Sequence, residues 1–370
     1  MAMTSEGTKI KQTVLIVDDE AGPRDALKII LRPFFNILSA HNAGTALDML
    51  KTQPVDLITL DQKLPDRQGM DLLKDIKHSY AGIEVIIVTG YGSLKSAMDG
   101  IRHGAAGYLL KPFNVTELIS LINQTLEKKR RLDFVREFFR SSTGLCGSEQ
   151  ENALAWQALK SGYVASATGG HGSATLPNEE TGLLPLLSDM LEAKDRQLLN
   201  HSSRVSFYAT LLGNRLKLTN EEQQSLTMGA FLHDIGACSD NPTASTDKDA
   251  SRTDCPERGA QLIRSLGLSA EVTQIVAYHH ERWDGQHSPS GLRGEGIPLL
   301  ARIVGIAEAF DHLTTEAPDC PPLSIDDAVR QLSLQSHTRF DPWLTDLFIE
   351  VVHECKASLP PMAIATSTAS

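Results

Sequence analysis

The chain has 370 residues, of which 41% are hydrophobic and 22% charged, as is typical of a soluble protein with room for two domains. Its 46 acidic and 35 basic side chains give a net charge of −11, which argues against broad, sequence-independent binding to nucleic acid. No apolar run reaches the roughly 18–20 residues of a membrane span. The N-terminus lacks the apolar core of a signal peptide, and the five cysteines form no CxxC pair. We therefore expect a cytoplasmic protein with reduced thiols, and neither DNA nor a membrane among its partners.

Strand and helix patterns alternate over residues 13–113. Short, near-continuous apolar runs of the kind that form buried parallel strands occur at 13–17, 36–40, 55–60, 84–88 and 107–110. Helical stretches separate these runs. The alternation predicts a doubly wound α/β domain, in which helices cover both faces of a five-stranded parallel sheet.

Polar side chains follow four of the predicted strands. Asp18 and Asp19 come after the first strand and Asp61 after the third. Because the carboxyl ends of parallel strands meet beside the topological switch point, we expect these carboxylates to converge. Converging carboxylates repel one another without a cation, and a set of oxygen ligands suits Mg²⁺. Thr89 and Lys111 end the fourth and fifth strands, where a hydroxyl and an ammonium could hold a phosphoryl group on Asp61.

Residues 12–125 resemble the receiver domain of two-component response regulators, which has a flavodoxin-like fold. The matching stretches are VLIVDDE, DLITLDQKLPDRQG, VTGYG and YLLKPF. The resemblance implies that Asp61 accepts a phosphoryl group and that a sensor histidine kinase is a partner. Its implied Mg²⁺ ligands are Asp18, Asp19 and Asp61, and its implied switch residues are Thr89, Tyr108 and Lys111.

A long helix is predicted over residues 114–141, because apolar residues recur there at three-, four- or near-heptad spacing. The charged section EKKRR at 127–131 is too polar for a core. The helix is therefore either a solvated connector or one half of a coiled coil in a homodimer. Residues 142–182 are rich in Gly, Ser and Thr, which predicts a flexible linker.

Residues 183–357 carry an entirely helical pattern, and the tail at 358–370 is expected to be disordered. Thr219 and Glu222 form the signature of a capping box. Helices are predicted over 184–216, from Thr219 to Gly236, from Pro256, from Ser269 to His280, over 298–314 and over 342–356.

Metal-ligand residue types gather in this helical region. They are His201, His233, Asp234, His279, His280 and Glu308, with Cys255 as an additional candidate. Clustered histidines with nearby carboxylates hold metal ions that polarise a phosphoryl oxygen and activate water. His201 lies one turn from Val205 on a buried helix side, where a histidine binds metal or donates to a carbonyl. Cys255 precedes a helix N-terminus, which favours a thiolate ligand of Zn²⁺ or Fe²⁺, and the alternative is a small buried thiol.

The same region resembles the HD superfamily, and specifically the HD-GYP output domains that are fused to receivers. The resemblance is carried by HSSRV, the HDIG step, PERGAQLI, HHERWDG, GLRGEGIPLLARIVGIAEAFDHLT and FDPWL. It implies an all-α domain that hydrolyses cyclic-di-GMP with divalent Fe, Mn or Zn ions, two of them in this chain. Asp234, Arg204 and Arg302 are the residues expected to serve catalysis and the substrate.

Several positions depart from the family pattern. The GYP triplet reads His287-Ser288-Pro289, and the usual Lys, His and Asp are replaced by Ala237, Cys255 and Glu308. Gln197 stands where some members place a Glu that supports a third metal, which argues for at most two ions. Glu308 keeps the charge and donor type of an aspartate, so metal binding is expected to survive. The lost GYP turn and the lost Lys weaken substrate positioning.

Two interpretations stay open from the sequence. The first is a metal phosphodiesterase regulated by phosphorylation of Asp61, with cyclic-di-GMP as substrate. The second is a catalytically inactive output domain that signals by binding a nucleotide or a protein. A DNA-binding regulator is disfavoured by the acidic balance and by the lack of a basic recognition helix near the C-terminus.

Overall fold

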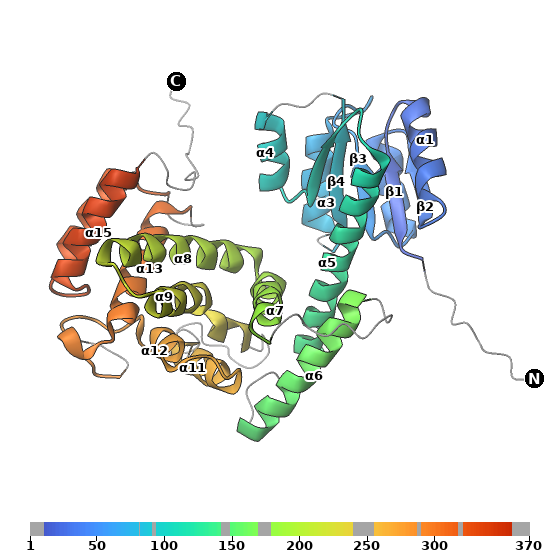
Figure 1. Cartoon of the computed structure of the whole chain (residues 1–370). Helices are drawn as coiled ribbons and strands as arrows, with labels where there is room; N and C mark the ends of the chain where they lie inside the picture. The colour runs from blue at the N-terminus through green and yellow to red at the C-terminus, as the bar shows by residue number, and fades with distance from the viewer. Residues whose placement is uncertain are drawn as a thin grey trace, which may run out of the picture. The chain divides into compact units, whose positions relative to one another are not determined.

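The computed structural model describes residues 11–80, 82–90, 94–141, 149–168, 179–239, 255–286, 290–316 and 321–356. The chain folds as two compact units, Met1–Arg131 and Leu132–Ser370 (Figure 1). Within the described ranges no helix has both the length and the apolar character that crossing a membrane would require.

The first unit is built on a parallel sheet of five strands in the order β2-β1-β3-β4-β5. The strands are β1 (Thr13–Val17), β2 (Asn36–Ala40), β3 (Leu57–Leu60), β4 (Glu84–Thr89) and β5 (Gly107–Leu110). The paired residues Val17 and Leu60 end β1 and β3, and Thr89 pairs with Leu110 where β4 and β5 end. The predicted doubly wound parallel sheet is therefore confirmed, with its polar strand ends at one edge.

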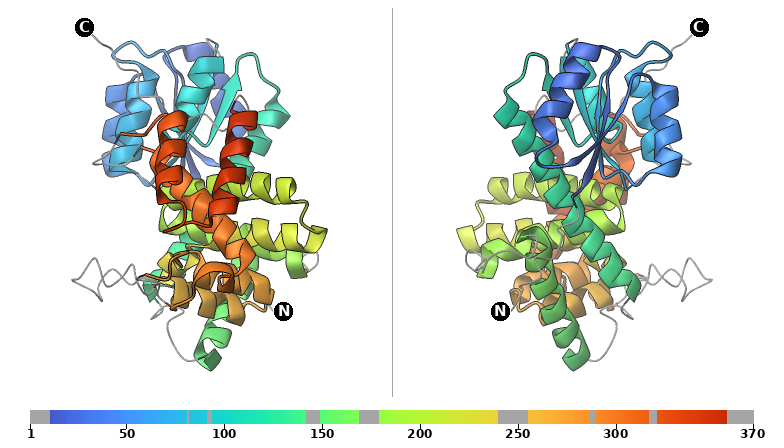
Figure 2. Two further views of the ribbon diagram at one scale, coloured as in Figure 1. Left: turned by 90° about the vertical axis from the view of Figure 1, so that its left-hand side faces the viewer. Right: turned by 90° about the vertical axis from the view of Figure 1, so that its right-hand side faces the viewer.

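Helices cover both faces of this sheet (Figure 2). They are α1 (Ala21–Leu31), α2 (Ala43–Thr52), α3 (Gly69–Ser79), α4 (Leu94–Arg102) and α5 (Val115–Ser141). Alternate residues of β1 point to opposite faces, so Ile16 packs in a core with α1 and α5. Leu15 packs in the other core with α2 and α3. This two-sided burial explains the near-continuous apolar runs of the strands.

The helix predicted over 114–141 is present as α5. Its residues up to Arg131 belong to the first unit, and those from Leu132 belong to the second. In the second unit Val135 is fully buried in a core that it shares with Trp156. Pairing of α5 with a second copy of the chain stays a prediction.

The predicted flexible linker at 142–182 is wrong over Glu149–Thr168. Residues Glu149–Thr168 form α6, whose Trp156, Leu159 and Tyr163 are buried. The hydroxyl of Tyr163 donates to Oδ2 of Asp189 at 2.6 Å. Small residues dominate the composition of the segment, but its few large apolar residues recur at helical spacing and find a core. The stretch richest in Gly, at 169–178, lies outside the described residues, as does the tail at 358–370.

The second unit is helical throughout its described part, as predicted. Its helices are α6, α7 (Glu179–Lys194), α8 (Arg196–Leu216), α9 (Asn220–Leu232), α11 (Cys255–Ser265), α12 (Ala270–Tyr278), α13 (Leu299–Thr314), α14 (Ile325–Gln335) and α15 (Pro342–Cys355), with the 3₁₀ turns η1 (Ile235–Ser239) and η2 (Gly294–Gly296).

Two helix predictions need correction, and one helix was missed. The single helix expected over 184–216 is interrupted at Asp195, whose side chain caps α8 by accepting from the backbone N–H of Gln197. The helix that begins with the confirmed capping box at Thr219 ends at Leu232, before Gly236. Helix α14 was not predicted. Serine is a preferred N-cap residue, so Ser324 was the available sequence signal. In the structure its side chain accepts a hydrogen bond from the backbone N–H of Asp327.

Helix α13 is buried along most of its length. It packs against α8, α9, α12, α14 and α15. Its polar residues Glu308 and Asp311 consequently lie inside the protein, 4% and 1% exposed. Buried carboxylates need hydrogen bonds or cations, so the fold itself calls for partners at these two positions.

Candidate functional site

The acidic site of the first unit lies at the carboxyl ends of β1 and β3. Ligand oxygens of Asp18, Asp19 and Asp61 lie within 4.8 Å of one another. Asp18 and Asp61 are buried, and Nζ of Lys111 lies 2.7 Å from an oxygen of each. Burial alone would lower the pKa of Lys111, but these two carboxylates outweigh it and raise that pKa. The predicted aspartates and lysine are thus brought together, with an arrangement that could hold Mg²⁺.

The two remaining predicted residues of this site lie on neighbouring strands. Thr89 is the last residue of β4 and is completely buried. Tyr108 lies in β5, is half-buried, and its hydroxyl is 3.1 Å from the hydroxyl of Ser96 in α4. The structure thus places both residues on the two strands that end beside Lys111.

The second unit brings together histidines from three separate helices. His201 lies in α8, His233 directly follows α9, and His279 directly follows α12. Nε2 of His201 is 3.2 Å from Nε2 of His233. The rings of His233 and His279 have centroids 5.1 Å apart, so the three imidazoles line one space.

Each of these imidazoles is held by its other nitrogen. Nδ1 of His233 donates to the carbonyl of Ala230 at 2.8 Å, and Nδ1 of His279 donates to that of Val276 at 3.0 Å. Nδ1 of His201 donates to the carboxylate of Asp311 at 2.7 Å. In all three cases Nε2 is left for the shared space. Histidine metal ligands characteristically have their second nitrogen fixed in this way.

Two carboxylates and a fourth histidine complete the cluster. Oδ2 of Asp234 lies 3.5 Å from Nε2 of His233 and 3.9 Å from Nε2 of His201. Ligands bonded to one ion at about 2.0–2.2 Å lie about 3–4 Å from each other, so these spacings suit a shared ion. Oε1 of Glu308 is 3.4 Å from Nε2 of His280. Among the described residues the ligand groups overlap, as His201–His233–Asp234 and Asp234–His279–His280.

The charges of the cluster favour the metal-binding form of its residues. Burial and the neighbouring His280 lower the pKa of His279 to about 4, so its imidazole is neutral near neutral pH. Burial would raise the pKa of Glu308, but a hydrogen bond from His280 and the nearby imidazoles outweigh it, and that pKa falls well below its usual value. The structure therefore holds a charged carboxylate beside a neutral ring.

Unpaired polar atoms point to a missing partner. In the part of the chain that the structure describes, Nε2 of His279 and Oε2 of Glu308 are buried without a hydrogen-bond partner. A buried ionised oxygen left unpaired costs several kcal/mol or more unless a cation binds it. Metal ions bound to these atoms would satisfy both, which makes the cluster a candidate metal centre.

The two predicted arginines lie beside the cluster and are paired with aspartates. Arg204 donates to Asp311 through Nε at 2.6 Å and Nη2 at 2.9 Å. Arg302 pairs with Asp341, lies over the ring of Trp283, and lines a small pocket together with His279. Nε of Arg302 is buried and has no partner among the described residues.

Other predicted features are not described or lie apart. The triplet His287-Ser288-Pro289 and the side chain of Cys255 lie outside the described residues. Cys255 is the first residue of α11, one position inside the helix that it was predicted to precede. Ala237 lies in η1, and Gln197 is exposed in the first turn of α8. Two residues, Asp311 and His312, were not assigned a role from the sequence. His312 lies one turn after Glu308, and that i,i+4 spacing was the available signal.

Comparison with known proteins assigns both units. Residues 14–123 match the family model of the response regulator receiver domain, and residues 185–344 match that of the HD domain. A "Probable cyclic di-GMP phosphodiesterase" of Vibrio cholerae is 27% identical, covering 91% of this chain and 77% of the relative. The "Cyclic di-GMP phosphodiesterase response regulator RpfG" of Xanthomonas campestris is 27% identical, covering 93% and 89%. A "Cyclic di-GMP phosphodiesterase" of Thermotoga maritima is 24% identical, covering 92% and 91%.

Proposed function

Since this chain joins a response regulator receiver domain to an HD domain, we propose that it is a phosphorylation-controlled, metal-dependent phosphodiesterase that acts on cyclic-di-GMP. The relatives that match over most of the chain carry the names of cyclic di-GMP phosphodiesterases. The observation that carries the proposal is the set of three imidazoles whose Nδ1 atoms are anchored and which share ligand groups with Asp234.

The ligands would divide between two ions. His201, His233 and Asp234 form one group, and Asp234, His279 and His280 form the other, with Asp234 shared between them. Iron, manganese or zinc suits such a set of nitrogen and oxygen donors. Ions bound there would polarise the scissile phosphate and supply hydroxide. Cys255 is an additional candidate ligand.

The protein side chains supply position and charge. Asp311 holds His201 in the tautomer whose Nε2 lone pair faces the centre. Arg302 lines a small pocket together with His279, and we assign its guanidinium to a phosphate oxygen or base edge of the substrate. Arg204, which is bidentate on Asp311, acts by holding that carboxylate in place.

In the receiver, we propose that a sensor histidine kinase donates a phosphoryl group to Asp61 with Mg²⁺ on Asp18, Asp19 and Asp61. Lys111 already contacts Asp61 and would move to a phosphoryl oxygen. Thr89 would contact a second phosphoryl oxygen, and the ring of Tyr108 would reorient together with Thr89. Phosphorylation would bias the receiver between two conformations and so change the output of the HD domain.

A non-catalytic output domain is the alternative function. It is favoured by the engagement of Arg204 with Asp311 and of Arg302 with Asp341, because each of these two arginines already has a carboxylate partner. The altered triplet at 287–289 and Ala237 favour it too. Each lost charge-assisted phosphate contact would weaken substrate binding by about 1.5–3 kcal/mol.

One paired measurement separates these functions. Metal content and cyclic-di-GMP turnover are measured on the full chain with Mn²⁺ or Fe²⁺, alongside the His233→Ala variant. We expect about two ions per chain, as in dinuclear phosphoesterases, and a linear or mononucleotide product that His233→Ala abolishes without unfolding the domain. Bound metal without turnover would support the non-catalytic alternative, and no metal would contradict both the centre and the enzyme.

A further inference from the structure

We propose that His312 is a further metal ligand of the HD domain, which closes a third ligand group with Glu308 and His201. The inference rests on the proposed metal centre and extends it. Neither the relatives nor the family descriptions assign a role to this residue. The group offers two imidazoles and one carboxylate, so its ligand is a borderline divalent cation such as Zn²⁺, Fe²⁺ or Mn²⁺.

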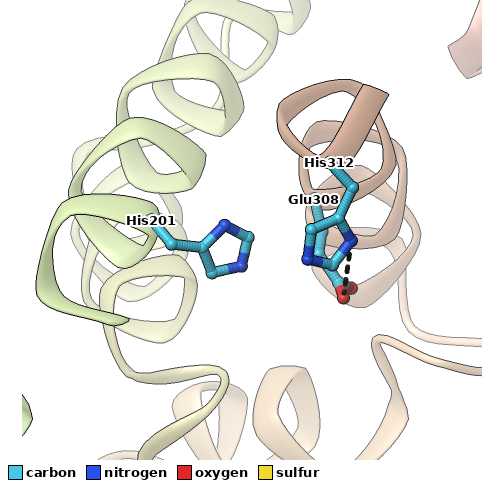
Figure 3. Close-up of side chains that lie close together, drawn as sticks. All are labelled: His201, Glu308 and His312. Carbon is cyan, nitrogen blue, oxygen red and sulfur yellow. Dashed lines mark ion pairs between the residues drawn. The ribbon is translucent and has the colours of Figure 1, made fainter. Parts of the chain in front are cut away.

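The first support is geometric. Glu308 and His312 are four residues apart on α13, so their side chains lie on one face of the helix. One ligand atom from each of His201, Glu308 and His312 lies within 4.8 Å of the others. Figure 3 shows the rings of His201 and His312 facing each other across the space between α8 and α13, with the carboxylate of Glu308 beside them.

The contacts of His312 do not explain its placement by hydrogen bonding. Its Nδ1 lies 3.8 Å from Oε1 of Glu308, which is too long for a hydrogen bond. Its ring is nearly parallel to that of His201, at 5° and with centroids 4.8 Å apart. The placement of the ring is therefore left to a ligand that His312 shares with its neighbours.

The second, independent support is the state of Glu308. Its side chain is 4% exposed, and Oε2 has no hydrogen-bond partner within the ranges that the structure describes. A buried carboxylate with an unpaired oxygen needs a cation. His280 approaches Oε1 at 3.4 Å and leaves Oε2 to another partner.

His201 limits how the ligand groups are used. Its Nδ1 is committed to Asp311, so only Nε2 can bind an ion. The groups His201–His233–Asp234 and His201–Glu308–His312 therefore compete for one nitrogen. His312 then acts either as an extra ligand on the ion of His201, or as the ligand that draws that ion toward Glu308. In both arrangements the side chain of His312, which is 60% exposed, faces solvent and gives the ion a route of exchange.

The test is metal binding by the full chain. Proteins freed of metal with a chelator are titrated with Co²⁺ and with Zn²⁺ by calorimetry, and the visible spectrum of bound Co²⁺ reports its ligands. His312→Ala removes the ring. His312→Phe keeps an aromatic ring against His201 but has no donor atom. His353→Ala is the control, because His353 is exposed on α15 and belongs to none of the ligand groups.

We expect both His312 variants to bind one ion at least about tenfold more weakly than the unchanged chain, with an altered Co²⁺ spectrum, and His353→Ala to match the unchanged chain. Unchanged binding in His312→Phe would overturn the inference and reduce His312 to a packing partner of His201. Equal binding in all proteins would overturn it while leaving the metal centre intact. Weaker binding in the variants without cyclic-di-GMP turnover in any protein would support the ligand and contradict the enzyme. An unchanged chain that binds no ion would contradict both.

Discussion

The carboxylate of Asp311 fixes the ring of His201, because Oδ2 accepts from Nδ1 at 2.7 Å. The same carboxylate accepts two hydrogen bonds from Arg204. Burial would raise the pKa of Asp311, but its hydrogen bonds from His201 and Arg204 outweigh burial and lower that pKa. An ionised Asp311 therefore selects the tautomer in which Nε2 of His201 is available to a metal.

Replacing this carboxylate tests its role. Asp311→Asn should weaken metal binding by about 10–100-fold, because an amide no longer enforces the tautomer of His201. Calorimetric titration of the metal-free chain measures the change. Asp346→Asn is the matched control, since Asp346 is exposed on α15. Equal affinities in the two variants would show that Asp311 does not position His201.

The pH dependence follows from the same contact. Burial would lower the pKa of His201, but its hydrogen bond to Asp311 outweighs burial and raises that pKa. Protonated His201 thus stabilises the metal-free fold. This contribution is complete below the unfolded pKa of histidine, about 6.5, and it is lost as the pH rises through the raised pKa of the folded state. A metal competes with the proton on Nε2, so affinity should increase over that pH range while the stability contributed by His201 decreases.

Thermal unfolding of the metal-free chain and Zn²⁺ affinity, both measured against pH, check these opposite trends. The variant Asp311→Asn should shift the rise in affinity to lower pH, because the pKa of His201 loses its main source of elevation. An affinity that stays constant above the unfolded pKa of histidine would contradict the assignment of His201.

Gly305 allows α13 to approach the end of α12. A Cβ added at Gly305 would lie 2.6 Å from the carbonyl oxygen of His279. Gly305→Ala should therefore cost about 1–3 kcal/mol of unfolding free energy and displace His279 from the cluster. Denaturant unfolding and metal content measure the two effects. Gly296→Ala is the control, because a Cβ there meets nothing within 4 Å. A stable variant that retained its metal would show that α13 and α12 can separate freely.

The receiver prediction concerns the phosphoacceptor. Asp61→Ala should abolish labelling by acetyl phosphate with Mg²⁺, which intact-protein mass spectrometry detects. Asp48→Asn should label normally, because Asp48 lies on the exposed surface of α2, where it pairs with Lys51. Labelling that persists in Asp61→Ala would place the acceptor elsewhere.

The amino-acid sequence was sufficient for features that depend on local patterns. Apolar runs and strand order place Asp18, Asp61 and Lys111 at one sheet edge, because parallel strands present their carboxyl ends together. The helical pattern of the second unit and the capping box at Thr219 follow from residues a few positions apart. Composition misled at α6, where three large side chains find a core despite a small-residue background.

Long-range packing decided the chemistry of the metal centre. His201 and Asp311 are 110 positions apart in the sequence. His201 can donate to Asp311 only because α8 and α13 pack against each other. The unpaired oxygen of Glu308 and the approach of His312 to His201 likewise depend on which face of α13 is buried. Sequence periodicity identifies a helix face but not its neighbour, so the ligand types were predictable, while their tautomers and unpaired atoms were set by the tertiary structure.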